Sequence, residues 1–356
     1  EMRRAIFVAA ASSAVAAPCR YRARVAYDGT GYAGMQYQVN APTIQSALQA
    51  ALAVRSQLAQ VRVVAAGRTD SGVHARGQTV HFELGGVDLE PQELERALGR
   101  LLPADVAVSR IERAVEVDAA GRPWHAIYWA TGKQYVYRLH SGRAAMDPMQ
   151  RLYRHHFGPV ALDLAAMTEA AALFEGEHDF AAFANLPRGT SPAYGACGSG
   201  SVRRVAAVRV VDEGDGYARI EVLLKGALYK MVRNVVGALV DVGAGKVTGD
   251  TIKQLLAEPS LRSRRSVKAA PIGGGDGSRR GGGVDDHSGG VAGVRGRVTG
   301  DPNWPRPAPA HGLTLESVFY GPPAWGGAYA HPLLEETVGA GVEWSDAAEE
   351  PLGGGG

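Results

Sequence analysis

Cysteine is scarce in this chain of 356 residues, which has only Cys19 and Cys197. Two cysteines cannot supply the disulfide framework of a small secreted domain, nor a cysteine-based zinc site. Long apolar runs are also missing, since none reaches the roughly 18 residues that indicate a membrane-spanning helix. We therefore expect unpaired thiols in a reducing compartment and no membrane association.

The net charge is only +2, but it is unevenly distributed. Residues 331–356 carry six acidic residues and no Lys or Arg, so the remaining chain has 38 basic against 30 acidic residues, or +8. The basic excess is concentrated in residues 121–154 and 201–265. Such local basic surface suits a polyanionic partner such as nucleic acid, although many ordinary enzymes share this charge pattern.

The N-terminus is rich in arginine, alanine and serine. Residues 1–24 hold five arginines and a single acid, Glu1. This composition is typical of organellar transit peptides, and a plain disordered extension is the alternative. We expect residues 1–20 to lie outside the fold, and because position 1 is not Met the chain can be a fragment. A plastid or mitochondrion is the favoured compartment, with cytoplasm or nucleus as alternatives.

Hydrophobic periodicity predicts a mixture of strands and helices. Strands are expected at residues 22–26, 61–65, 79–84, 106–111, 134–140, 205–211 and 217–224. Helices are expected after Thr43, from Pro91, over 162–174 and over 231–242, the last ended by Gly243. Some neighbouring strands are joined by loops too short for a parallel crossover. The pattern predicts an α+β fold of two α/β lobes with a largely antiparallel sheet and a groove between the lobes.

The predicted lobes are residues 21–145 and residues 146–272 with 307–325, followed by an acidic tail over 326–356. Residues 273–306 interrupt the second lobe, and twelve of these 34 residues are glycine. So few bulky apolar side chains cannot offset the entropy of ordering the segment, which we expect to be a disordered insertion. It is either a solvated linker or an arginine–glycine segment that touches RNA phosphates.

The loop from Gly67 to Gly77 is the most informative part of the chain. Two apolar strands flank it, and Gly67 and Gly72 permit backbone conformations that other residues avoid. Arg68 and Asp70 stand two residues apart, so one can hold a phosphate while the other faces a reacting group. Asp-Ser-Gly is also a common turn sequence, so the residue types alone leave Asp70 as either a turn residue or a reactive carboxylate.

Several segments together resemble the TruA family of pseudouridine synthases, in collinear order from about residue 21 to 320. They are Tyr27-Asp28-Gly29-Thr30 with Tyr32, Gly34 and Gln36; Ala66 to Ala75 with Gln78 to Phe82; Trp124-His125-Ala126 with Lys133 to Tyr137; Met231 to Gly237; and Ala308 to Leu313. Met35, Ile127 and Ser71 stand where the family usually has Trp, Arg and Ala. The resemblance implies the pseudouridine synthase fold, with an RNA-binding cleft between the lobes.

The resemblance also implies the roles of individual residues. Asp70 is the expected nucleophile, Tyr135 stacks on the target base, and Arg233 pairs with the aspartate. Arg68, Thr69, His74 and Lys133 are the expected RNA-binding residues. The implied substrate is RNA, most commonly the anticodon stem and loop of tRNA, bound by a homodimer without metal or organic cofactor. Attack at uracil C6, attack at ribose C1′ and an elimination route all remain open.

Three other readings compete with this one. The first is a catalytically silent RNA-binding protein on the same fold. The second is a hydrolase built from Asp70, Ser71 and His74, although no Gly-x-Ser-x-Gly elbow accompanies them. The third is a metal enzyme using His74, His81, His155 and His156, whose spacing matches no standard zinc motif.

Overall fold

The computed structural model describes residues 19–185, 200–260 and 304–321. The predicted transit-peptide segment up to residue 18, the acidic tail and most of the glycine-rich insertion lie outside the described residues. The chain divides into two compact units, Glu1–Ala130 and Thr131–Gly356. The division comes earlier than the predicted one after residue 145, because strand β5 (Ala130–His140) pairs with a later strand of the second unit.

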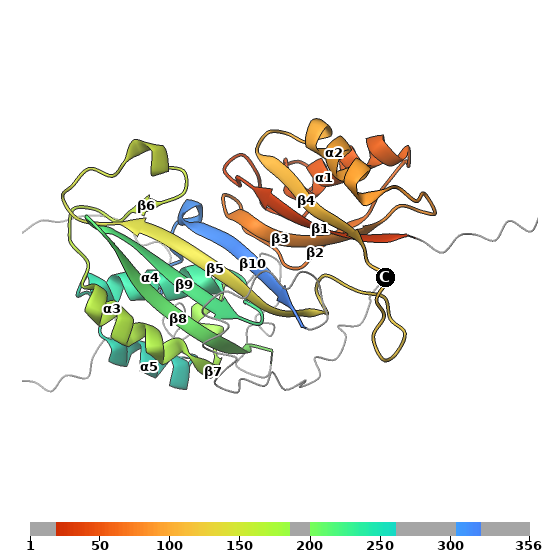
Figure 1. Ribbon diagram of the computed structural model, residues 1–356. Coiled ribbons are helices and arrows are strands. Elements are labelled where there is room, and N and C mark those ends of the chain that lie inside the picture. The colour runs from red at the N-terminus through yellow and green to blue at the C-terminus, as the bar shows by residue number, and fades with distance from the viewer. Residues whose placement is uncertain (1–18, 186–199, 261–303, 322–356) are drawn as a thin grey trace, which may run out of the picture. The chain divides into compact units, whose positions relative to one another are not determined.

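The first unit is a four-stranded antiparallel sheet with two helices on one face (Figure 1). The strand order is β4-β1-β3-β2. The elements are β1 (Arg20–Tyr27), α1 (Ile44–Ser56), β2 (Val63–Ala65), β3 (His74–Glu83), α2 (Pro91–Leu101) and β4 (Val106–Arg113). Leu48 and Leu52 of α1 and Leu94 and Leu98 of α2 are buried and contribute to the core of this unit, whereas Leu101 at the end of α2 is 42% exposed.

Both helices of this unit begin where their sequences indicate. Thr43 caps α1 and forms a capping box with Ser46, in which each side chain accepts from the other's backbone N–H at 3.1 Å. Pro91 opens α2, where its missing N–H leaves no bond unmade. The two predicted helix starts are confirmed.

The second unit has a mostly antiparallel sheet with helices packed along one face (Figure 1). The strand order is β10-β5-β9-β8-β7, and β6 pairs in parallel with β5. Its remaining elements are β6 (His155–His156), α3 (Leu164–Ala171), β7 (Gly176–Asp179), β8 (Val202–Gly214), β9 (Tyr217–Leu224), α4 (Met231–Gly243), α5 (Gly249–Ala257) and β10 (Leu313–Tyr320). The predicted α+β class with a largely antiparallel sheet is confirmed.

Helix α4 ends at Gly243, one residue later than predicted. Gly243 is therefore the last helical residue and not the glycine that closes the helix, and the nearby glycine with a left-handed backbone is Gly245, with φ of +67°. Gly243 instead permits close packing of α4 on α3, since a Cβ there would lie 2.6 Å from the Met167 sulfur. In the part of the chain that the structure describes, no helix is both long and apolar enough to cross a membrane.

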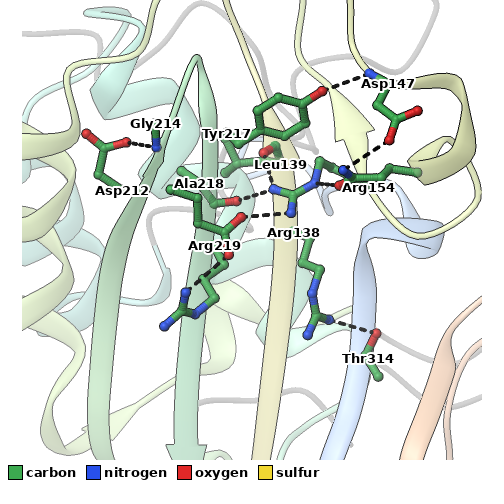
Figure 2. Close-up of polar contacts among 12 residues, drawn as sticks. Arg138, Leu139, Asp147, Arg154, Asp212, Gly214, Tyr217, Ala218, Arg219 and Thr314 are labelled. Carbon is green, nitrogen blue, oxygen red and sulfur yellow. Dashed lines mark hydrogen bonds and ion pairs between the residues drawn. The ribbon is translucent and has the colours of Figure 1, made fainter.

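Arg154 ties together several strands of the second unit (Figure 2). Its Nη1 donates to the carbonyl oxygens of Leu139 on β5 (2.9 Å) and Ala218 on β9 (3.0 Å). Its Nη2 pairs with Glu213 at 2.7 Å, and its guanidinium lies over the Tyr217 ring. Burial alone would raise the pKa of Glu213, but hydrogen bonds from Arg154 and Arg219 hold that pKa below its ordinary value.

We predict that Arg154→Ala lowers the free energy of unfolding by about 3 kcal/mol, because it leaves buried carbonyls and Glu213 without their donor. Lys246→Ala is the control, since Lys246 also forms an ion pair in the second unit, with Asp241, but is 67% exposed, and its loss should cost less than about 1 kcal/mol. Urea denaturation measures both. The ion-pair part of the Arg154 effect should be full above the ordinary Glu213 pKa of 4.5 and shrink as pH falls. Equal losses for the two variants would contradict this role.

Candidate functional site

Asp70 lies in the loop between β2 and β3. Strand β3 begins at His74, so this loop is shorter than the sequence pattern predicts. Asp70 is half-buried, Arg68 and Ser71 are exposed, and the Val73 N–H donates to the Asp70 carbonyl at 3.1 Å. The loop is therefore a tight turn that displays a carboxylate and a guanidinium two residues apart.

A second segment, residues 29–35, forms hydrogen bonds with the Asp70 loop. The Met35 N–H donates to the Thr69 carbonyl at 3.2 Å, and the Gly72 N–H donates to the Tyr32 carbonyl at 3.4 Å. The Ser71 hydroxyl donates to that same Tyr32 carbonyl at 3.1 Å. Asp70 thus lies between two anchored backbone positions.

Thr69 and His74 are both buried, and the contacts they make are to the protein. The Thr69 hydroxyl lies 2.8 Å from the Tyr27 hydroxyl, and burial raises the pKa of Tyr27 to about 12. His74 Nδ1 accepts from the Gly29 N–H at 3.0 Å and lies 3.1 Å from Asp28 Oδ1. These side chains, which the resemblance implied as RNA contacts, connect the Asp70 loop to the last residue of β1 and to the segment that follows it.

Gly34 is required by the close approach of the two segments. Its φ of +107° is rarely adopted by residues with side chains. A Cβ at this position would lie 2.6 Å from the Thr69 carbonyl oxygen and 3.2 Å from the Asp70 carbonyl carbon. The glycine of the opening motif therefore allows the backbone to reach the Asp70 loop.

We predict that Gly34→Ala costs at least about 2 kcal/mol of unfolding free energy and displaces the Asp70 loop, because strain and overlap act together. Gly31→Ala is the control, since no atom lies within 4 Å of a Cβ there and it should change stability by less than about 0.5 kcal/mol. Thermal or urea unfolding measures both. Similar stability of the two variants would show that the loops are not held by this contact.

The other predicted catalytic residues lie in the second unit. Tyr135 and Lys133 are on β5, opposite Val222 and Leu224 of β9, and Tyr135 is buried. Arg233 lies in the first turn of α4, and its Nε donates to the Ala308 carbonyl at 2.7 Å. The Ala308 N–H donates in return to the Arg233 carbonyl at 2.9 Å. Residue Ala308 of the closing motif is therefore bound to the first turn of α4 and orients the Arg233 side chain.

The sequence analysis did not single out Tyr137 as part of the core beside the site. Tyr137 follows Tyr135 by two residues and shares its face of β5. Its ring is fully buried and packs against Gly312, where a Cβ would lie 2.5 Å from the ring. Within the described ranges its hydroxyl has no hydrogen-bond partner. Burial raises the pKa of Tyr137, although the charge of Arg233 acts in the opposite direction. The two-residue spacing was the signal that could have found it.

We predict that Tyr137→Phe leaves the free energy of unfolding unchanged or raises it by up to about 1 kcal/mol, because it removes a buried hydroxyl that has no partner. Tyr27→Phe should instead cost about 1 kcal/mol, since the bond to Thr69 is lost. Urea denaturation compares the two. Destabilisation by Tyr137→Phe would show that the hydroxyl is bonded in solution.

The predicted residues therefore form two groups. One group lies in the β2–β3 loop of the first unit and at the start of β3: Arg68, Thr69, Asp70 and His74. The other group lies in the second unit: Lys133, Tyr135 and Arg233. The convergence of Asp70 with Tyr135 and Arg233 in a basic cleft stays a prediction. The rival metal site gains no support, because among the described residues no three His, Cys, Asp or Glu side chains are grouped to hold a metal ion.

Comparison with known proteins gives a consistent result. The family model described as tRNA pseudouridine synthase matches residues 23–127 and 170–275, which include Asp70 and Arg233. The chain is 39% identical over 255 residues to tRNA pseudouridine synthase A 1 of Protochlamydia amoebophila, covering 71% of this chain and 93% of that protein. It is 38% identical over 235 residues to tRNA pseudouridine synthase A of Geobacter sulfurreducens, covering 66% and 88%.

A third relative, tRNA pseudouridine synthase A of Listeria welshimeri, is 33% identical over 260 residues, covering 71% of this chain and 96% of that protein. Fold, loop and relatives together define an isomerase that acts on RNA. The chain belongs to the tRNA pseudouridine synthase family.

Proposed function

We propose that this chain converts uridine to pseudouridine in tRNA and that Asp70 is its nucleophile. The observation that carries the proposal is the position of Asp70 on a tight turn, which segment 29–35 holds through backbone hydrogen bonds. A carboxylate used in catalysis must be held in a fixed position relative to its substrate. The relatives named tRNA pseudouridine synthase A support the same substrate.

The reaction breaks the bond between uracil N1 and ribose C1′ and forms a bond between uracil C5 and C1′. N1 gains a proton and C5 loses one, so the product is an isomer of the substrate. A carboxylate that bonds transiently to the substrate divides this exchange into easier steps. The first bond forms at uracil C6 or at ribose C1′, and an elimination route is the third alternative.

The other residues act on binding and charge. The target base must leave its stack, and the exposed Arg68 guanidinium is placed to hold the displaced nucleotide's phosphate. Tyr135 supplies an aromatic face for the base. Arg233, whose Nε donates to the Ala308 carbonyl, is the proposed partner of the Asp70 carboxylate. Lys133 contributes a further phosphate contact.

The anticodon stem and loop is the proposed target region, and a homodimer is the proposed assembly. An organelle is the proposed compartment, on the basis of the arginine-rich residues 1–24. Sequencing the pseudouridines lost from each RNA class and compartment when the protein is absent tests target and location. Sedimentation at micromolar concentration tests the assembly.

We predict that Asp70→Asn reduces pseudouridine formation to below roughly a thousandth of wild type, because the amide keeps the shape but removes the nucleophilic oxygen. RNA affinity should change little, since phosphate contacts and stacking dominate it. Tritium release from tRNA containing 5-tritiated uridine measures the chemistry, and filter binding measures the affinity.

Ser71→Ala is the control for this experiment. It should retain most activity, because the Ser71 hydroxyl has no role in the proposed chemistry and the backbone hydrogen bonds of the loop remain when its bond to the Tyr32 carbonyl is lost. Near-normal release by a folded Asp70→Asn variant would end the proposed mechanism. A wild-type protein that binds tRNA but releases no tritium would instead favour the silent RNA-binding reading. Loss of a hydrolytic activity in Ser71→Ala would favour the hydrolase.

A further inference from the structure

The chain makes a long excursion between β5 and β6, over residues 141–154, which we call the β5–β6 excursion. Arg154 closes it, with hydrogen bonds to the carbonyls of Leu139 and Ala218 (Figure 2). The Tyr217 hydroxyl accepts from the Asp147 N–H at 2.8 Å. The Gly142 N–H donates to the Gly158 carbonyl at 3.0 Å. The excursion is therefore fixed at its base to the segment that follows β6, and at its middle and end to strands β5 and β9.

Its only acidic side chain is used within the excursion itself. Asp147 caps the short helix Pro148–Gln150 by accepting from the Met149 N–H at 2.9 Å. Arg154 is buried and paired with Glu213. The two remaining charges, Arg143 and Arg151, are exposed.

Neither Arg143 nor Arg151 forms an ion pair with any residue that the structure describes. Arg151 donates only to the Pro148 carbonyl, at 3.0 Å. Met149 is 77% exposed and Tyr153 is 42% exposed beside them. The surface of the excursion thus combines two uncompensated cations with an aromatic ring on a fixed backbone.

We propose that the β5–β6 excursion is a second RNA-contacting surface of the enzyme, in which Arg143 and Arg151 bind phosphates and Tyr153 contributes a stacking face. The inference rests on the proposed function, since it takes the substrate to be tRNA. None of these residues takes part in the chemistry. Because the anchors fix the backbone before binding, little loop entropy is lost when RNA arrives.

The charge decides between RNA and a second protein chain. Met, Tyr and Arg are enriched at protein interfaces as well. An interface between identical chains, however, would bring Arg143 and Arg151 near their own copies or require acidic partners for them. Phosphates supply that negative charge directly, and the basic excess of residues 121–154 includes both arginines.

The test is the double substitution Arg143→Gln with Arg151→Gln in the full chain. The matched control is Arg96→Gln with Arg100→Gln, which removes the same charge from two exposed arginines on α2. Binding of an unmodified tRNA transcript is measured between 50 and 200 mM salt, together with kcat and KM for tritium release. Thermal unfolding verifies that both variants fold.

Loss of two phosphate contacts should lower the slope of log affinity against log salt by about 2 and weaken binding on the order of tenfold. We expect KM to rise by the same factor while kcat stays near wild type, and the control to change less than about twofold. Tyr153→Ala should weaken binding at least about fivefold, with Tyr153→Phe near wild type, because stacking needs the ring.

An affinity and salt slope equal to the control's would overturn the proposal. Unchanged RNA binding with dissociation of a dimer in sedimentation would assign the excursion to a protein interface instead. Failure of the proposed function is distinguishable, because a wild-type protein without tritium release leaves the binding comparison intact.

Discussion

The structure of the site depends on one backbone contact, in which residues 32–35 bind residues 69–72. The Met35–Thr69 and Gly72–Tyr32 hydrogen bonds require the backbones of the two segments to lie close together, and a side chain at position 34 would overlap the Thr69 carbonyl. Thr69 and His74 add side-chain bonds to the same pair of segments. The position of Asp70 is thus set by residues 35 to 38 positions earlier in the chain, through backbone hydrogen bonds that do not depend on the side chains of either segment.

In the second unit, Arg233 is likewise positioned by a segment that is distant in the sequence. Arg233 and Ala308 exchange two hydrogen bonds across a long stretch of chain, and one turn later Gly237 allows the Arg306 backbone to lie against α4. Trp304 adds a bond from its Nε1 to Asp241 at 2.8 Å. The closing segment therefore helps to position Arg233.

Local signals in the sequence predicted the elements with strong periodicity or caps. Thr43 and Pro91 marked helix starts, because each acts within a few residues. The helix α5 and the short strand β7 were not predicted. The prediction for α4 was one residue short, because Gly243 is its last helical residue and packs against Met167. The site residues were found from motif resemblance, whereas their support, from Gly34 to Ala308, is a tertiary property that no local pattern encodes.

The start of α4 has a consequence for the balance between stability and activity. The helix begins after Lys230, whose left-handed backbone has φ of 59°, with no side-chain cap and no acid in the first turn. Arg233 adds a cation where the helix dipole disfavours one, by about 0.3–1 kcal/mol. A designer seeking stability would place Asp or Ser there and Glu at position 233. Each such change would also lower the local positive potential, so stability and positive charge at this helix end cannot be raised together.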